Sequence, residues 1–339
     1  MKRTNPIFNI KRPSSSALLY SFFLLIIIYG CERTEKPIKP FDRGSVITNS
    51  VSMGNTYNDH IFFNLDSNKV IKTVKRIDWD IAFDCQPNRH IILLNNGRGV
   101  YAAATGKINF NEVTDTIGFK FLWGQPDFNL DSLAMGQWWL KPAEIFIINL
   151  GSDDFGMPIG FIKCMPELQT DKSLKITWCK LNENTPKTRV IAKDELFNFN
   201  YYSFIKDKPA DIEPPKNMWD LWFTQYVKLV YSNDFKITQN YQLLGVLVNT
   251  ERINVALDTK NLYSDITPNN LTTYNFLTIR DGIGYDWKSF NFNTNSYSVN
   301  SKINYILKVS DGFYYKLHFL DFYNDLGVKG YPKFEFQKL

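Results

Sequence analysis

One short motif occurs twice in this chain, and the repeat that it marks constrains the fold more than any other feature. Residues 79–83 read Trp-Asp-Ile-Ala-Phe, and residues 219–223 read Trp-Asp-Leu-Trp-Phe. Near the end of each half, a shift of 158 residues aligns Leu181 with Leu339 and the stretches before them without a gap. Because such landmarks keep their order over roughly 100 residues, the sequence predicts an internal repeat. The predicted units are residues 45–182 and 196–339, joined by a linker at residues 183–195.

Alternating apolar and polar residues predict β-strands in both units. Trp79, Ile81 and Phe83 would share one face of a strand, as would Phe334 and Phe336 near the C-terminus. No long window has the apolar spacing of an amphipathic helix, and 16% of the residues are aromatic, which favours strands. The sequence therefore predicts an all-β protein of two tandem, mainly antiparallel β-sandwich or open-barrel domains. We expect each motif to place its Trp in a core and its Asp at a neighbouring backbone turn.

The first thirty residues have the layout of a bacterial lipoprotein signal peptide. Basic residues come first, and an almost wholly apolar run follows at residues 17–29. This run is too short for the roughly 20 residues that span a bilayer, and its length is typical of a signal peptide. Gly30 and Cys31 follow directly, and a small residue before Cys at this point resembles the lipidation signal. We predict that residues 1–30 are removed and that Cys31 carries the lipid.

The residues after Cys31 predict where the protein is held. Residues 31–44 are polar and contain proline, as a tether requires. Glu32 stands where an inner-membrane retention signal would place Asp. We therefore expect a lipid-anchored protein of the outer membrane, on its periplasmic or its cell-surface face.

Composition excludes several classes of function. The formal net charge is +5, but residues 1–30 contribute +4 of it, so the mature chain would carry +1. Such a chain has no electrostatic basis for nucleic-acid binding. The three His residues make a multi-His metal centre improbable, and the sequence contains neither a Gly-x-Ser-x-Gly nor a His-Glu-x-x-His motif. We expect a protein that is not an enzyme.

Residues 215–339 resemble the HmuY-type lipoproteins of Bacteroidetes, which capture heme. The resemblance rests on Trp-Asp-Leu-Trp-Phe-Thr-Gln-Tyr at 219–226, Ile-Gly-Tyr-Asp-Trp-Lys at 283–288 and the stretch from Gly312 to the C-terminal Leu339. The first unit is a weaker copy, so the chain resembles a tandem of two HmuY-like units. The resemblance implies a non-enzymatic surface lipoprotein for iron acquisition. It would bind heme or a related tetrapyrrole and pass it to an outer-membrane receptor of the TonB-dependent type.

The best-known members of that family hold heme iron between two His or two Met side chains. Residues 250–300, where those ligands would lie, contain no His, Met or Cys, and the matching part of the first unit offers only Met135. Tyr also ligates ferric heme, which makes Tyr285 and Tyr297 candidates, although a packed or surface role is the alternative for each. His90 precedes a glycine-bearing loop and is the candidate that we favour as iron ligand, in the first unit or between the units. A solvated His is the alternative.

Three cysteines remain after Cys31. If residues 171 and 172 form a two-residue turn, Cys164 and Cys179 face each other on the two strands of a hairpin. The sequence thus predicts a cross-strand disulfide between Cys164 and Cys179, provided that the pair is of the non-hydrogen-bonded type. Cys85 would remain a free thiol.

Two other classes of function stay open. A surface protein that binds a glycan or a receptor partner could use aromatic loops, and a glycoside hydrolase would need two carboxylates at a defined separation. The Trp residues available as stacking platforms are Trp123, Trp138, Trp139 and Trp287.

Overall fold

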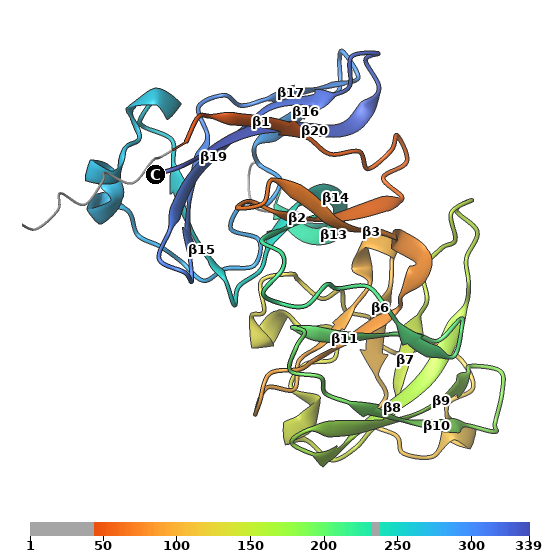
Figure 1. Ribbon diagram of the computed structural model, residues 1–339. Helices are drawn as coiled ribbons and strands as arrows, with labels where there is room; N and C mark the ends of the chain where they lie inside the picture. Colours follow the sequence, from red (N-terminus) through yellow and green to blue (C-terminus); the bar gives the residue numbers. More distant parts are fainter. Residues whose placement is uncertain (1–43, 232–237) are drawn as a thin grey trace, which may run out of the picture. The chain divides into compact units, whose positions relative to one another are not determined.

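The computed structural model describes residues 44–231 and 238–339, and strands dominate these ranges (Figure 1). The predicted signal peptide, Cys31 and the tether up to residue 43 lie outside the described residues. Within the described ranges no helix is long and apolar enough to span a membrane. The helical segments described are short 3-10 turns: η1 (Arg76–Asp78), η2 (Asn96–Arg98), η3 (Phe110–Glu112), η4 (Leu130–Ser132), η5 (Trp138–Leu140), η6 (Tyr263–Asp265) and η7 (Pro268–Thr273). The prediction of an all-β, antiparallel fold is confirmed.

Two antiparallel sheets form what we call the first sheet pair. One has the strand order β10-β9-β8-β7-β6 and the other the order β12-β11-β4-β5. Side chains such as Phe83, Ile148 and Trp178 fill the space between the two sheets and form what we call the first core. The strands are β4 (Ile81–Asp84), β5 (Ile92–Leu94), β6 (Tyr101–Ala104), β7 (Phe146–Asn149), β8 (Phe161–Thr170), β9 (Ser173–Lys180), β10 (Lys187–Ala192), β11 (Phe199–Ser203) and β12 (Lys208–Ala210).

The second sheet pair repeats this plan. Its sheets have the orders β1-β20-β19-β18-β15 and β14-β13-β2-β3, and a separate hairpin joins β16 to β17. Phe223, Leu307 and Phe334 lie between the sheets, in what we call the second core. The strands are β1 (Ile47–Ser50), β2 (Asp59–Asn64), β3 (Lys69–Lys75), β13 (Leu221–Tyr231), β14 (Thr238–Val248), β15 (Ile253–Asp258), β16 (Lys288–Asn291), β17 (Ser296–Val299), β18 (Asn304–Val309), β19 (Tyr314–Tyr323) and β20 (Lys329–Lys338).

The two four-stranded sheets share a third apolar cluster, which we call the central cluster. Phe62 and Trp222 enter it from one sheet, and Ala82 and Tyr201 from the other. Successive side chains of a strand point to opposite faces, so Trp222 faces the central cluster while its neighbour Phe223 faces the second core. Each motif strand therefore contributes to two cores.

The strands exchange between the repeats. Each Trp-Asp motif is preceded by a hairpin, and that hairpin pairs with the motif strand of the other repeat. Phe62 of β2 pairs with Trp222 of β13, and Tyr201 of β11 pairs with Ala82 of β4. The predicted unit boundaries follow the repeat in the sequence, whereas these pairings cross the linker. Strands β1–β3 join the second sheet pair, and β10–β12 join the first.

The terminal hairpins of the two repeats differ in register. Cys164 pairs with Trp178 in the first hairpin, and Leu317 pairs with Phe336 in the second. The shift of 158 residues therefore holds for β9 and β20 but is wrong for β8 and β19, which are related by a shift of 153. The physical reason is the longer connection between β19 and β20, which a gapless alignment cannot represent.

Candidate functional site

Each motif Asp anchors the exchanged hairpin through its carboxylate. Asp80 accepts hydrogen bonds from the backbone N–H of Phe204, at 2.6 Å, and from the Arg98 guanidinium. Both members of this ion pair have fully buried side chains. Asn95 donates its side-chain amide to the carbonyl oxygen of Trp79 at 2.9 Å, which fixes the turn after β5. The expectation that Trp79 lies in a core and Asp80 at a backbone turn is confirmed.

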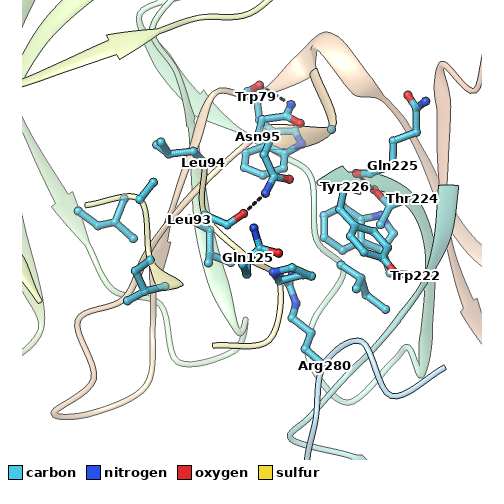
Figure 2. A pocket seen from close by; sticks show the side chains of 18 residues that line it. Trp79, Leu93, Leu94, Asn95, Gln125, Trp222, Thr224, Gln225, Tyr226 and Arg280 are labelled. Carbon is cyan, nitrogen blue, oxygen red and sulfur yellow. Dashed lines mark hydrogen bonds between the residues drawn. The ribbon is translucent and has the colours of Figure 1, made fainter. Parts of the chain in front are cut away.

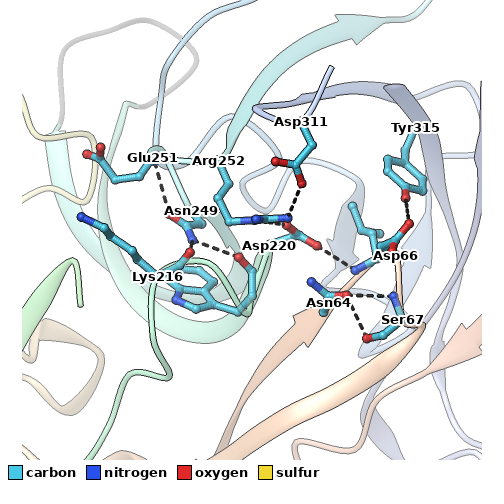
Figure 3. Close-up of polar contacts among 12 residues, drawn as sticks. Asn64, Asp66, Ser67, Lys216, Asp220, Asn249, Glu251, Arg252, Asp311 and Tyr315 are labelled. Atoms are coloured by element: carbon cyan, nitrogen blue, oxygen red, sulfur yellow. Dashed lines mark hydrogen bonds and ion pairs between the residues drawn. The ribbon is translucent and has the colours of Figure 1, made fainter. Parts of the chain in front are cut away.

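The second motif repeats the network with the same residue types (Figure 3). Asp220 accepts from the backbone N–H of Leu65 at 2.8 Å and from Nε of Arg252 at 2.9 Å. Asn249 donates to the carbonyl oxygen of Trp219 at 2.9 Å. Burial raises the pKa of Asp220 above its ordinary value, and this effect outweighs the hydrogen-bond donors, which lower it. These two networks hold the framework on which any binding site rests.

A pocket of about 800 Å³ opens at one end of the first sheet pair. Cavities that bind small ligands commonly have volumes of roughly 300–1,000 Å³ and mostly apolar walls. The residues that line this one, which we call the Trp178 pocket, are mainly apolar. Its apolar walls are Leu150, Ile159, Phe161, Ile162, Trp178, Leu181, Phe204 and Ile205, and its polar residues are Thr114, Lys180, Asn182, Glu183, Lys187 and Asp207.

Charged side chains surround the Trp178 pocket at its rim. Lys187 lies over the Trp178 ring, with Nζ 4.5 Å from the ring centroid, and pairs with Asp207 at 3.1 Å. Asp207 also accepts from Arg189 at 2.5 Å. Lys180 has a 69% exposed side chain and lies 3.6 Å from Glu183. The rim thus offers cations whose present partners are exposed or half-exposed and can be exchanged for anionic groups of a ligand.

His90 lies in the connection between β4 and β5, which belong to the four-stranded sheet of the first pair, and it does not line the Trp178 pocket. Its Nδ1 is 3.3 Å from Nζ of Lys193, which also donates to the carbonyl oxygens of Gln86 and Arg89. Burial, and next the Lys193 charge, lower the pKa of His90, so the imidazole is neutral at physiological pH. Because an ammonium group can only donate, Nδ1 accepts and the proton of the neutral ring sits on Nε2. The lone pair that would ligate iron is therefore occupied by Lys193.

The other predicted ligands lie in separate places. Met135 is buried in the first core, at 4% exposure. Tyr285 packs against the central cluster and Tyr297 against the second core, where its ring lies 4.9 Å from the Phe290 ring. Among the described residues no group of three or more His, Cys, Asp or Glu forms a metal cluster. The structure does not gather these four candidates around one cavity.

The predicted disulfide is wrong. Lys163, and not Cys164, pairs with Cys179, because an irregularity between Leu168 and Thr170 shifts the register of β8 by one residue. Neighbouring residues of a strand point to opposite faces, so Cys164 lies in the first core while Cys179 lies in an apolar cluster outside it. Both cysteines are free thiols, as is Cys85.

The Trp residues considered as stacking platforms are mostly packed. Trp287 is fully buried and stacks on Phe319 at 3.9 Å, and Trp138 is 5% exposed. Trp139 is half-buried beside His90, and Trp123 packs against Tyr101 at 4.6 Å. The sequence analysis singled out none of the aromatic residues of the Trp178 pocket. They alternate with polar residues in the same way as the residues of any strand that faces a core, so no pattern marks them as a binding site.

Two buried charges at the central cluster also escaped the sequence analysis. Glu213 accepts hydrogen bonds from the backbone N–H groups of Asn198 and Phe199, both at 3.1 Å, and from Nε1 of Trp219 at 3.2 Å. Burial raises its pKa to about 7. Arg280 is 7% exposed, and its guanidinium lies over the rings of Phe128, Phe199 and Trp222. Neither residue stands in a recognisable motif, so only the fold reveals them.

Comparisons with known proteins identify the family. A model of the HmuY protein family matches residues 56–336, a range that includes both Trp-Asp motifs. A search of curated proteins found no match.

Three solved structures are similar over most of their length. Apo PinO from Porphyromonas gingivitis has 8% identity and a TM-score of 0.29, with 87% of this chain and 98% of that one covered. The apo HmuY analog of Tannerella forsythia has 14% identity and a TM-score of 0.25, covering 88% and 98%. A protein from Bacteroides vulgatus, described as HmuY-like and heme-binding, has 10% identity and a TM-score of 0.23, covering 86% and 90%. TM-scores this low add no argument, and it is the family model, matched over most of the sequence, that shows that the chain belongs to the HmuY family.

Proposed function

We propose that this chain is a non-enzymatic, lipid-anchored protein of the outer membrane that binds heme or a related tetrapyrrole and delivers it to a TonB-dependent receptor. Membership of the HmuY family is the observation that carries the proposal. The tandem of two HmuY-like units is part of it, and the matching Trp-Asp networks support that part.

The Trp178 pocket is the place where we propose that the tetrapyrrole binds. A volume of about 800 Å³ suits a ligand of this size, and its aromatic and aliphatic walls suit a flat apolar ring. Lys180 and Lys187 stand at the rim, where they could pair with the carboxylates of a porphyrin. None of the described residues that line the pocket is His, Met, Cys or Tyr. The ring would therefore be held by its faces and its carboxylates, without a pair of axial ligands.

Ligation by His90 is the alternative form of this proposal. It requires Lys193 to leave Nδ1, after which either Nδ1 is the ligand or the ring proton moves to Nδ1 and Nε2 becomes the ligand. Trp139, 6.0 Å from His90, would then lie beside the porphyrin. Binding in the Trp178 pocket predicts that the iron is not needed for affinity, whereas ligation by His90 predicts that it is.

The test is a titration of residues 32–339 with ferric heme and with metal-free protoporphyrin, followed by visible absorption. Binding in the Trp178 pocket predicts saturable binding of both, with similar affinities. Ile205→Glu, which places a carboxylate in a 47% exposed wall position, should weaken both by about tenfold or more. The matched control is Leu257→Glu, at a 59% exposed position on β15, and it should bind as the unmodified chain does.

Each outcome assigns the site. If His90→Ala abolishes the heme spectrum while Ile205→Glu does not, the Trp178 pocket is the wrong location and His90 is the ligand. If neither compound binds, the tetrapyrrole proposal fails.

Glycan binding is the second candidate function. The observation that favours it is the Trp178 pocket itself, which combines an aromatic floor with Asn182 and Asp207 but contains no side chain of the types that ligate heme iron in this family. Retention of the unmodified chain on a polysaccharide column, reduced by Ile205→Glu and without any porphyrin binding, would establish it.

The lipid anchor is tested separately. Cys31→Ala should leave an unlipidated precursor, because the acyl chains are attached at that sulfur. Membrane attachment of this variant at the normal level would rule out Cys31 as the anchor.

A further inference from the structure

Two cavities differ in size and in the charges that line them. The smaller one, of about 30 Å³, lies in the central cluster, with Trp79, Trp222 and Arg280 among its walls (Figure 2). The Trp178 pocket, of about 800 Å³, is lined by both the ammonium group of Lys187 and the carboxylate of Asp207. A ligand in the larger pocket would therefore lie against an ion pair.

The Asp207 carboxylate connects the two sheets of the first pair. Asp207 lies in the turn between β11 and β12, which belong to the four-stranded sheet. Its Oδ2 accepts from Nζ of Lys187 at 3.1 Å and from the Arg189 guanidinium at 2.5 Å, and both of these residues are on β10 of the five-stranded sheet. Its Oδ1 accepts from the Tyr202 hydroxyl. One carboxylate thus receives three donors beside the pocket.

The second sheet pair makes the matching connection without charge. Its turn between β2 and β3 has the same length as the turn between β11 and β12, so Asn68 corresponds to Asp207. The register of β1 on β20 matches that of β10 on β9 under the shift of 158 residues, so Asn49 corresponds to Arg189. The side-chain amide of Asn49 donates to Oδ1 of Asn68 at 2.7 Å. An amide pair stands where the first sheet pair has an ion pair.

The other two donors are also replaced by uncharged residues. Ile47 occupies the position of Lys187, and Phe63 occupies that of Tyr202. The backbone of the turn is the same in both pairs, because φ is +48° at Asp207 and +52° at the matching Asn. A neutral set of side chains therefore joins the sheets of the second pair, and joining the sheets does not explain the charged set of the first.

We propose that Lys187 and Arg189 form a carboxylate-binding subsite of the Trp178 pocket, and that Asp207 fills this subsite until the carboxylate of a ligand takes its place. This proposal rests on the proposed function, in which the Trp178 pocket is the binding site, and it adds a class of ligand: a flat apolar ring system that carries a carboxylate. Nζ of Lys187 is 4.5 Å from the centroid of the Trp178 ring, so the subsite lies directly beside an apolar wall.

The exposure of the ion pairs permits this exchange. The side chain of Asp207 is 24% exposed, that of Lys187 43% and that of Arg189 40%. Ion pairs as open as these contribute little to stability, because water competes for both partners. A ligand carboxylate would replace one anion by another, so the two cations would stay paired. Asp207 competes with the ligand, and removal of its charge should strengthen the binding of anionic ligands alone.

The test is a fluorescence titration of residues 32–339 with 1-pyrenebutyrate and with uncharged 1-pyrenebutanol, which share one ring system. Asp207→Asn should raise the affinity for 1-pyrenebutyrate by about threefold or more and leave that for 1-pyrenebutanol unchanged. This variant should fold, because Asn stands in the matching turn. Arg189→Met should lower the affinity for 1-pyrenebutyrate by a similar factor. The matched control is Asp66→Asn, which removes a carboxylate from the turn of the second pair and should change neither affinity.

Several results would overturn the subsite. They are an affinity of Asp207→Asn for 1-pyrenebutyrate that is unchanged or lower, an equal gain with 1-pyrenebutanol, unchanged binding by Arg189→Met, or no binding of 1-pyrenebutyrate by any of these proteins.

Protoporphyrin and its dimethyl ester separate this proposal from the proposed function. If protoporphyrin does not bind while Asp207→Asn binds 1-pyrenebutyrate more tightly, the subsite stands and the tetrapyrrole proposal fails. If Ile205→Glu weakens the binding of protoporphyrin but Asp207→Asn leaves its affinity relative to the ester unchanged, the pocket is the tetrapyrrole site and the subsite is refuted.

Discussion

The two Trp-Asp networks use the same residue types but differ in their exposure to water. In the first, the side chains of Asp80 and Arg98 are fully buried. In the second, Asp220 is 2% exposed and Arg252 is 13% exposed. Arg252 also reaches Asp311 at 3.5 Å, a residue whose side chain is 60% exposed. One repeated sequence motif thus produces a fully enclosed ion pair in one place and a pair with a partly exposed Arg in the other.

The difference follows from what packs against each turn. The turn that carries Arg98 lies against β13, where Gly97 approaches the backbone of Gln225 so closely that an added Cβ would lie 2.2 Å from its carbonyl oxygen. The corresponding turn of the second network carries Glu251, an exposed residue. The first network is therefore fully enclosed at the junction between the repeats. In the second network Asp220 and Asn249 are buried but Arg252 is partly exposed, and Glu251 of its turn lies 3.5 Å from Arg89 of the first repeat. Two copies of one motif can therefore make the same local contacts and still contribute different amounts to the free energy of unfolding.

Loss of the Arg partner should separate the two networks most strongly. Arg98→Met leaves the Asp80 carboxylate buried without its cation, which typically costs about 3–5 kcal/mol. Arg252→Met should cost less, about 1–2 kcal/mol, because water can reach the partly open pair. Urea unfolding followed by circular dichroism measures both free energies of unfolding. Equal losses in the two variants would show that burial does not distinguish the networks.

Adding a single methyl group at Gly97 should also destabilise the fold, because the first turn is closely packed. Gly97→Ala brings Cβ into the Gln225 carbonyl, so the strand must move, at a cost of about 1–3 kcal/mol. Glu251→Ala at the matching turn should change the free energy of unfolding by less than about 0.5 kcal/mol. The same urea experiment checks both. If Gly97→Ala were as neutral as Glu251→Ala, the close packing of the first turn would not contribute to stability.

Titration of Lys288 should sharpen the comparison of the two cores, since this ammonium group lies at the second core. Its Nζ donates to the carbonyl oxygen of Leu244 at 2.5 Å and lies 4.3 Å from the Trp287 ring centroid. Burial lowers its pKa from 10.5 to about 7. Between these values the unfolded chain binds more protons than the folded chain, so stability increases with pH. We expect Lys288 to contribute a gain of about 2 kcal/mol between about pH 7.5 and 9.

Lys288→Met removes the titrating group and is the control for this effect. The gain in the free energy of unfolding over that range should disappear in the variant. If both proteins showed the same pH dependence, another group would be responsible.

Period-two alternation was sufficient to predict the strands that begin at Ile81 and Leu221, and the burial of both motif Trp rings. The expectation that Trp79 shares a strand face with Ile81 and Phe83 is wrong, because Trp79 precedes β4 and its ring turns into the central cluster. Alternation could not predict that the hairpin around Phe62 pairs with the other repeat, because pairing with either motif strand satisfies the same alternation. The pocket around Trp178 depends on the course of the chain after β9, and the charge of Arg280 is revealed as buried only when both repeats meet. Features set by local pattern were accessible from sequence, and features set by the contact of distant segments were not.

The terminal hairpins provide the smallest expected effect and a direct test of register. The shift near Leu168 directs Cys164 and Cys179 to opposite faces of β8–β9, so no bridge forms and reductant should leave the unfolding midpoint unchanged. In the second repeat Leu317 occupies the position of Cys164, and His318 contacts Glu335 across that hairpin at 2.7 Å. Burial raises the pKa of all three thiols, that of Cys85 to about 12, so they remain protonated and slow to exchange at physiological pH. Thiol counting on the unfolded, unreduced protein that lacks residues 1–31 should find three free thiols. A count of one would restore the bridge, and with it the register without the irregularity.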